Sequence, residues 1–331
     1  MFLVSVIFLI VMGVAIGWSI GANDAANSLG TAVGSKVLTL RQAIILIAVF
    51  GLLGAVLQGS YVTKTLGKGI VNLALLDKQV ALYLAILATF AACLWVVIAT
   101  YWKMPISTSH SIVGAIAGGG LAVGAAVKWK LLLDIFICWI LTPVGAALIA
   151  FVFYLFFRWL FPRILPLKYE RPVTSVLIII SGCYVAFSWG ANDVANATGL
   201  INGAGVLPVW LCVLIGGLAI VLGIVTWGYK VIETIGSNIT HLLPLMAFSA
   251  QLASAVNVHV YTLMGIPVST SHSIVGAIVG VGLVRGIKVI NMRIFKDIVF
   301  CWIATPFISG VLCFGLMKFF MFFMPFIRPA S

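Results

Sequence analysis

The chain has 331 residues, of which 63% are hydrophobic and only 8% are charged. Soluble domains carry roughly 25% charged residues, so this composition excludes a soluble globular protein and indicates a polytopic membrane protein in a lipid bilayer. The formal net charge of +12 lies in short segments between apolar runs. No basic and aromatic residues interleave on a polar face, so we expect no nucleic-acid partner.

Apolar runs of spanning length begin at the N-terminus. Residues 1–22 lack a basic stretch ahead of their apolar run, so we expect a first transmembrane helix and not a cleaved signal peptide. Further runs lie at about 40–62, 80–101, 105–127 and 131–157, and then at about 173–191, 207–229, 242–264, 267–285 and 298–323. All six cysteines lie inside apolar runs without ligand spacing, so we expect neither disulfides nor structural zinc.

Two motifs occur twice. The heptapeptide Gly-Ala-Asn-Asp-Ala-Ala-Asn at 21–27 returns at 190–196 with one alanine replaced by valine, and the Ser-Thr-Ser-His block at 105–114 returns at 267–276. A third match relates 134–143 to 297–306. These duplications predict an all-α membrane protein with two repeats of about five transmembrane segments. The expected parts are repeats at 1–157 and 173–331, joined by a basic linker at 158–172.

The orientation of the repeats depends on the segment that follows each Ser-Thr-Ser-His block. If this segment crosses the membrane, each repeat has an odd number of spans, and twelve of the 19 lysines and arginines lie on one face. If it returns to its own side, they divide ten to nine. The crossing scheme also puts both dense clusters on one face, namely Arg158, Arg163, Lys168 and Arg171, and Arg285, Lys288, Arg293 and Lys296. By the positive-inside rule we expect inverted-topology repeats in the cell (inner) membrane, with the linker cytoplasmic and both termini outside.

Inverted repeats are typical of transporters, which build one site at the repeat interface and expose it alternately on the two sides. Simple counting places the duplicated motifs near the segment ends. They must therefore dip into the membrane as broken or re-entrant helices, and flanking glycines together with Pro105 and Pro267 permit such breaks.

The motifs contain the groups of an ion-binding site. Asp24 and Asp193 are carboxylates inside apolar segments, which is costly and therefore points to function, although polar caps of helix ends are the alternative. The hydroxyls of Ser107, Thr108 and Ser109, and of Ser269, Thr270 and Ser271, with free amides at a helix start, suit an oxyanion. The alternative is that each hydroxyl bonds its own backbone as a cap.

The four motif segments hold no lysine or arginine. An anion beside the aspartates would be repelled unless cations lay between them, so we expect cotransport of an oxyanion with small cations. Na⁺ suits the carboxylate, amide and carbonyl oxygens of the Asn-Asp segments, whereas protons would need titratable groups, which are few. His110 and His272 are as suited to orienting a neighbour as to contacting substrate. Asp134 and Asp297 are expected at helix starts, where the dipole stabilises a carboxylate.

The stretch Gly-Ala-Asn-Asp-Ala-Ala-Asn-Ser-Leu-Gly-Thr-Ala-Val-Gly-Ser at 21–35, its copy, and the duplicated Pro-x-Ser-Thr-Ser-His closely resemble the inorganic phosphate transporter (PiT) family. The resemblance covers essentially the whole chain. It implies a secondary transporter, not an enzyme, that moves inorganic phosphate with Na⁺ or, in some bacterial members, H⁺, as a homodimer. It also implies that Asp24 and Asp193 are essential.

The chain departs from the animal members of that family. They carry a glutamate in the second span of each half, where this chain has Gly51 and Ile220. Their long central cytoplasmic domain is also missing, so the chain resembles a compact prokaryotic version.

We therefore assign the motif residues between the two ions. The expected phosphate ligands are Asn23, Ser107, Thr108, Ser109, Asn192, Ser269, Thr270 and Ser271. The expected Na⁺ ligands are Asp24, Asn27, Asp193 and Asn196, with the cations bridging to phosphate. An H⁺-coupled phosphate or sulfate permease is the nearest alternative, and a channel is a weaker one. A hydrolase triad of Ser109, His110 and Asp24 is disfavoured because catalysis needs one set of residues and all three are duplicated.

Overall fold

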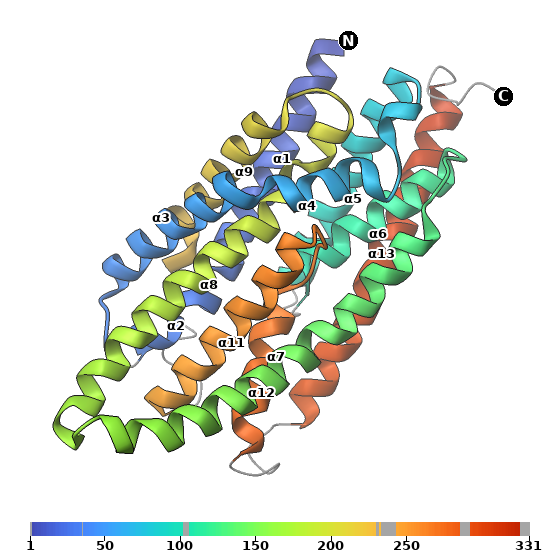
Figure 1. The fold of residues 1–331 in the computed structure, drawn as a ribbon. Helices are drawn as coiled ribbons and strands as arrows, with labels where there is room; N and C mark the ends of the chain where they lie inside the picture. The colour runs from blue at the N-terminus through green and yellow to red at the C-terminus, as the bar shows by residue number, and fades with distance from the viewer. Residues whose placement is uncertain are drawn as a thin grey trace.

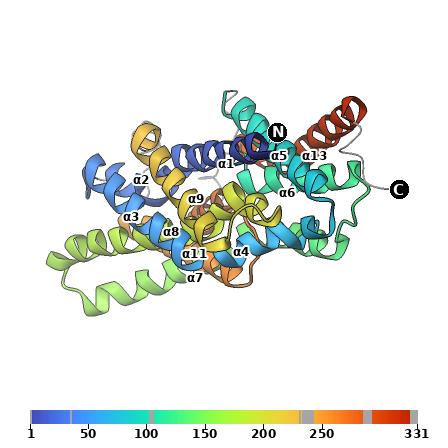
Figure 2. The same cartoon turned by 90° about the horizontal axis from the view of Figure 1, so that it is seen from above.

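The computed structural model describes residues 2–34, 36–101, 106–229, 232, 243–284 and 292–324. Within these ranges every regular element is a helix, and one isolated β-bridge pairs Val71 with Val127. The long helices lie side by side in an elongated bundle. Figure 1 shows the bundle from the side, and Figure 2 shows it from above. The prediction of an all-helical membrane protein is confirmed.

Every apolar run predicted from the sequence corresponds to a helix. The first half contains α1 (Phe2–Asp24), α2 (Ala26–Gly34), α3 (Leu40–Gln58), α4 (Ser60–Lys64), a π-helical turn (Thr65–Gly69), a 3₁₀ turn (Leu73–Leu75), α5 (Lys78–Tyr101), α6 (Thr108–Ala122) and α7 (Trp129–Ile164). The second half contains α8 (Leu167–Gly203), α9 (Val209–Gly223), a π-helical turn (Ile224–Gly228), α11 (Pro244–Leu263), α12 (Thr270–Leu283) and α13 (Met292–Phe323).

Seven helical segments of the described chain are long and apolar enough to cross a membrane. The helices that follow the Ser-Thr-Ser-His blocks are shorter, with 15 residues in α6 and 14 in α12. At 1.5 Å per residue they extend over roughly 20 Å, less than the ~30 Å of the hydrocarbon core. Neither helix can cross the membrane alone.

The chain enters α5 and leaves α6 at the same end of the bundle. Val71, which precedes α5, pairs with Val127, which follows α6, and the amide of Lys128 donates to the carbonyl of Ile70 at 3.0 Å. Near its start, α6 bonds to α5 through the Ser111 hydroxyl and the Ala92 carbonyl, at 3.2 Å. Thus α6 runs back alongside α5 to the face from which α5 came.

Helices α1 and α8, which carry the two copies of the heptapeptide, run antiparallel. Gly13 of α1 packs against Ala197 and Ile201 near the end of α8, whereas Leu29 of α2 packs against Gly182, nearer its start. The absence of side chains at these glycines lets the backbones approach closely, as in other membrane helix pairs. The antiparallel packing brings both copies of the motif to the same level of the bundle.

The two halves are interleaved through glycine contacts. A side chain at Gly114 of α6 would collide with the backbone of Pro306 in α13, and one at Gly276 of α12 would collide with the backbone of Pro143 in α7. Each short helix therefore packs against the last helix of the other half. The interface between the halves is built into the core of the bundle.

The expected helix breaks occur in one copy of the heptapeptide only. The first copy is interrupted at Ala25, between α1 and α2, whereas α8 continues without a break through 190–196. The prediction of a break in the second copy is wrong. The second copy is fully buried, and a continuous helix satisfies its backbone groups internally, without water or other partners.

The basic segment at 158–172 is not a loop. Helix α7 continues to Ile164 and α8 begins at Leu167, so only Leu165 and Pro166 separate them. Since α7 has 36 residues and extends over about 54 Å, it continues beyond the ~30 Å hydrocarbon core, where charged side chains and helical backbone coexist. The two helices form the projecting hairpin at the lower left of Figure 1. The second basic cluster lies outside the residues whose side chains are described.

Candidate functional site

The short helices α6 and α12 begin with the Ser-Thr-Ser-His blocks, and in each the first serine is an N-cap. The Ser107 hydroxyl accepts a hydrogen bond from the amide of His110, and the Ser269 hydroxyl accepts one from the amide of His272, both at 3.3 Å. As caps, these two hydroxyls use their oxygen atoms as hydrogen-bond acceptors. Their hydrogen atoms remain available for donation to another group. The following hydroxyls reach the aspartates.

The first group, here called the Asp24 cluster, consists of Asp24, Asn27 and Ser271. The Asp24 carboxylate accepts from the Ser271 hydroxyl at 3.1 Å and from the Asn27 amide at 3.3 Å. The Asn27 amide also donates to the Ser271 oxygen at 3.1 Å. All three side chains are partly exposed.

The second group, the Asp193 cluster, consists of Asp193, Asn196, Ser109 and Thr270. One oxygen of Asp193 lies 3.3 Å from the Asn196 amide and 3.5 Å from the Ser109 hydroxyl, and the other accepts from the Thr270 hydroxyl at 3.2 Å. The Asn196 amide donates to the Ser109 oxygen at 2.9 Å, and the Ser109 hydroxyl also lies 3.1 Å from the Val268 carbonyl. This cluster is buried.

The two clusters pair the halves crosswise. Asp24 of the first half meets Ser271 of the second, and Asp193 of the second half meets Ser109 of the first. Neither half could form its cluster alone. The duplicated motifs therefore make a single site at the interface of the halves, next to the N-termini of α6 and α12, whose free amides and positive dipole ends favour an anion.

The carboxylates are near enough for their negative charges to repel each other. Their hydrogen-bond partners in the described part of the chain are hydroxyls and amides, not lysine or arginine. A buried charge without a counter-charge costs several kcal/mol. The arrangement therefore requires a positive charge from outside the protein.

Asn196 supplies an unused acceptor at this position. Its amide nitrogen donates to neighbours in the Asp193 cluster, whereas its side-chain oxygen is buried and has no hydrogen-bond partner among the described residues. A buried carbonyl oxygen beside a carboxylate is the donor type that hard cations prefer. The donor set fits the Na⁺ ligands predicted from the sequence.

The two asparagines that precede the aspartates differ. The buried Asn192 amide donates to the Thr262 hydroxyl at 2.9 Å and the Ile266 carbonyl at 3.3 Å, and its oxygen accepts from the Val268 amide at 3.2 Å. It therefore fixes the segment that leads into α12. Asn23 is partly exposed and makes one long contact, 3.5 Å, to the Ser19 hydroxyl. Both remain predicted phosphate ligands, with Asn23 the more available.

Trp139 and Trp302 lie beside the site, although the sequence motifs did not predict them as site residues. Trp139 stacks on His110 at 3.6 Å between ring centroids, and Trp302 stacks on His272 at 3.5 Å. Both tryptophans belong to the third duplicated segment, so the duplication itself was the signal that could have identified them. Thr262 and the Val268 carbonyl have no comparable signal in the sequence.

Asp134 is not at a helix start. Helix α7 begins at Trp129, so Asp134 lies in its second turn, where it is exposed. The expectation of a stabilising helix dipole at this residue is wrong, because the effect is confined to the first turn. The side chain of Asp297 lies outside the described residues.

Comparison with known proteins identifies the relatives of this site. The phosphate transporter family matches residues 20–313. A protein of Pyrococcus furiosus named as a candidate phosphate permease is 35% identical, over 95% of this chain and 96% of its own length. An inorganic phosphate transporter of Arabidopsis thaliana chloroplasts is 30% identical, over 89% of this chain and 69% of its own.

A solved structure described as the sodium-dependent phosphate transporter superposes with a TM-score of 0.85 and 31% identity. The superposition covers 97% of this chain and 100% of the other. The similarity therefore includes both halves and all the motif segments.

Proposed function

Because this chain belongs to the phosphate transporter family, we propose that it is a secondary active transporter that imports inorganic phosphate together with Na⁺. The observation that carries the proposal is the crosswise pairing of Asp24 with Ser271 and of Asp193 with Ser109. It places two carboxylates and two helix N-termini, one of each from each half, around one point. Such a site offers anion donors and cation ligands side by side.

Phosphate binds between the N-termini of α6 and α12. Thr108, Ser109, Thr270 and Ser271 supply hydroxyls there, the capping residues Ser107 and Ser269 retain their own hydroxyl protons, and the first-turn amides add their dipoles. Hydrogen bonds to a charged acceptor contribute about 1.5–3 kcal/mol each. A few such bonds offset the cost of taking the oxyanion out of water.

Na⁺ joins the carboxylates to the phosphate. Repulsion between unit charges about 4 Å apart is about 4 kcal/mol at an effective dielectric constant of 20, so direct contact of phosphate with Asp24 or Asp193 is unfavourable. Cations held by these carboxylates and by the side-chain oxygens of Asn27 and Asn196 replace this repulsion by an attraction for phosphate. The buried, unpaired oxygen of Asn196 supports this role.

Alternating access follows from inverted repeats. Helix α6 ends at the face where α5 begins, which is the face opposite the end of α5. This arrangement, together with the antiparallel packing of α1 and α8, supports the crossing scheme and hence an odd number of spans per repeat. The site is partly exposed around the Asp24 cluster and buried around the Asp193 cluster. With both termini outside, this state is open toward the cytoplasm.

The cell (inner) membrane and a homodimer complete the proposal. The family resemblance implies the homodimer, and the positive-inside rule supports a cytoplasmic location for the basic hairpin of α7 and α8 at 158–172. Labelling of single cysteines at positions 168 and 288 with an impermeant reagent tests the topology. Labelling from opposite faces would exclude the inverted arrangement.

Transport into proteoliposomes tests the function. Radiolabelled phosphate uptake is measured with a Na⁺ gradient and a pH gradient imposed separately, with choline replacing Na⁺ and sulfate as the competing anion. We expect accumulation driven by Na⁺ and weak competition by sulfate, which carries no proton to donate at neutral pH. Uptake that follows the pH gradient alone would replace Na⁺ by H⁺, and uptake without saturation would favour a channel.

A further inference from the structure

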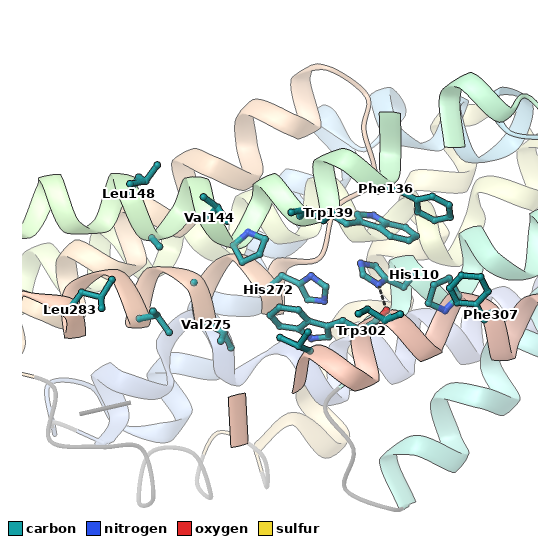
Figure 3. Close-up of a pocket in the computed structure, with 18 residues that line it drawn as sticks. His110, Phe136, Trp139, Val144, Leu148, His272, Val275, Leu283, Trp302 and Phe307 are labelled. Carbon is teal, nitrogen blue, oxygen red and sulfur yellow. Dashed lines mark hydrogen bonds between the residues drawn. The ribbon is translucent and has the colours of Figure 1, made fainter. Parts of the chain in front are cut away.

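Four aromatic rings form a continuous row of contacts between the two halves, here called the stack, in which each indole is stacked on an imidazole and the two imidazoles meet edge to face. They are Trp139 of α7, His110 of α6, His272 of α12 and Trp302 of α13, with successive centroid distances of 3.6, 4.5 and 3.5 Å. Figure 3 shows the two imidazoles between the two indoles. The histidines are 2% and 1% exposed. Each half of the chain contributes two of the rings.

Polar bonds also cross between the halves at this stack. The Nδ1 atom of His110 lies 3.0 Å from the Trp302 carbonyl oxygen, and the indole N–H of Trp139 donates to the Pro267 carbonyl at 3.0 Å. A carbonyl only accepts, so Nδ1 of His110 carries the proton in this contact. Its Nε2 is then an acceptor, which has no partner among the described residues.

The two histidines of the stack lie in the first turns of α6 and α12, next to the residues of the proposed phosphate site. His110 and His272 follow Ser109 and Ser271 in sequence, and successive side chains on a helix point about 100° apart. Each serine therefore faces an aspartate while the adjacent histidine faces the other short helix. The Trp139 bond holds Pro267, two residues before the Ser269 cap.

The rings lie on the wall of an apolar pocket of about 640 Å³, whose other described lining residues are apolar, among them Val144, Val275 and Phe307. Val144 and Phe307 are exposed at the surface of the described chain, so the pocket is open and not enclosed. Among the described residues that line it, only His110 and His272 have titratable side chains. An imidazolium on this apolar wall would lack a counter-charge.

On the premise of the transport function above, we propose that His110 and His272 are positioning residues that set the spacing of α6 and α12. The contact between their rings fixes how far apart Ser109 and Ser271 lie, and therefore how well the two helix N-termini fit one tetrahedral oxyanion. The histidines act through packing and one hydrogen bond, not through titration.

Phosphate affinity of purified variants is the first test. We expect His110→Ala to weaken binding about tenfold, because it removes both the stacking and a buried hydrogen bond. His110→Phe keeps the stacking and His110→Asn keeps a donor near Nδ1, so each restores part of the affinity. The pH dependence of binding stays that of the wild type in all three. Val152→Ala, on the exposed face of α7, is the matched control and leaves the affinity unchanged.

A distance measurement that needs no phosphate is the second test. Spin labels at Leu121, near the end of α6, and Leu283, at the end of α12, are both exposed, and they are introduced after replacement of the six native cysteines. Double electron–electron resonance spectroscopy gives the distribution of distances between the two spin labels. His110→Ala and His272→Ala are expected to broaden or shift it, and Val152→Ala is not.

The outcomes separate this proposal from the proposed function. If the wild type fails to bind phosphate, the transport proposal falls and the distance test still decides the role of the stack. Unchanged distances and unchanged affinity in folded His110→Ala and His272→Ala proteins would overturn the positioning role. So would variants that shift the pH profile, because the histidines would then act as titrating groups.

Discussion

The Asp24 and Asp193 clusters are built from the same motif, yet their surroundings differ. Asp24 follows one full helix and precedes a break at Ala25, and it is partly exposed. Asp193 lies inside the unbroken α8, is 2% exposed and accepts from one more hydroxyl, that of Thr270. The two clusters of the single site therefore differ in accessibility. The proposed alternating access would use this difference, since only one side of a transport site is open in any one state.

The same difference appears at two further pairs of equivalent positions. Asn27 and Thr31 are partly exposed, whereas their equivalents Asn196 and Leu200 are buried. Because residues four apart lie on the same side of a helix, the difference lies along one face. The proposed transport cycle exchanges these two environments. A cation at Asp193 would be the last to leave when the site opens along α2.

Neutralising the two aspartates should show the largest contrast. We expect Asp193→Asn to abolish uptake, because three donors would then face an amide in a buried site that can no longer hold a cation. Asp24→Asn should bind poorly at ordinary Na⁺ concentration and partly recover when Na⁺ is raised, because its cluster is partly exposed. The measurement is phosphate affinity across a Na⁺ series at constant ionic strength.

Two controls sharpen this contrast. Asp134→Asn changes an exposed aspartate outside the site and should behave as the wild type. If the loss in Asp24→Asn is the same at every Na⁺ concentration, the carboxylate contacts phosphate directly, through a shared proton, and the bridging cations must be abandoned.

Serine replacements test the crosswise pairing with a smaller effect. Ser109 contacts Asn196, Asp193 and the Val268 carbonyl, whereas Ser271 contacts only Asp24 and Asn27. Losing one hydroxyl to a charged acceptor costs about 1.5–3 kcal/mol, roughly ten- to hundredfold in affinity. We expect Ser109→Ala to lie at the upper end and Ser271→Ala at the lower.

Isothermal titration of phosphate into each purified serine variant measures the difference. Ser175→Ala, at the exposed start of α8, is the control for purification and stability. Wild-type affinity in both Ser109→Ala and Ser271→Ala would place the anion away from the N-termini of α6 and α12.

The sequence was sufficient for much of the architecture because duplication and hydropathy are local signals. Apolar runs located the long helices but not α2, which follows the first heptapeptide. The two copies of Asn-Asp and Ser-Thr-Ser-His identified the residues that meet. It could not show that Asp24 pairs with Ser271 of the other half, because pairing depends on how α6 and α13, and α7 and α12, interleave. It also could not separate the two copies. The helix breaks at Ala25 and continues through Val194 although both residues are fully buried, and a single exchange of alanine for valine does not predict that difference.

The hydrogen bonds of Gln251 link α11 to α2 and α8, and we expect them to have a moderate effect on how accessible the Asp24 side of the site is. The Gln251 amide donates to the Ser28 carbonyl at 2.8 Å and the Thr31 hydroxyl at 2.6 Å, and the Gln251 oxygen accepts from Ser181 at 2.8 Å. Thr89, at the matching position of α5, bonds only within its own helix, to Ala85 at 2.7 Å. The short helix α2 is therefore tied by polar bonds that have no counterpart at the other end of the site.

Replacing Gln251 should loosen α2. We expect Gln251→Leu to raise the labelling rate of a cysteine at Val33 several-fold from the cytoplasmic side, because the buried Ser28 carbonyl and the partly exposed Thr31 hydroxyl both lose their donor. Thr89→Val should leave the rate unchanged. The measurement is reaction with an impermeant thiol reagent in oriented membranes, and equal rates in both variants would mean that α2 is held by packing alone.

The smallest effect on affinity is expected at Asn23. The same experiment distinguishes Asn23 from Asn192, which occupies the same position in the second copy of the heptapeptide. Asn192 holds three groups of the segment before α12, so Asn192→Ala leaves buried groups unpaired and should lower the free energy of unfolding by about 1–3 kcal/mol. Asn23 fixes no such segment, and Asn23→Ala should keep the melting temperature while phosphate affinity falls about tenfold, the lower end of the range for one hydrogen bond to a charged acceptor. Thermal melting with and without phosphate, in parallel with titration, measures both quantities. A stability loss in Asn23→Ala equal to that in Asn192→Ala would mean that both asparagines are structural, and phosphate would then be held by the hydroxyls and helix N-termini alone.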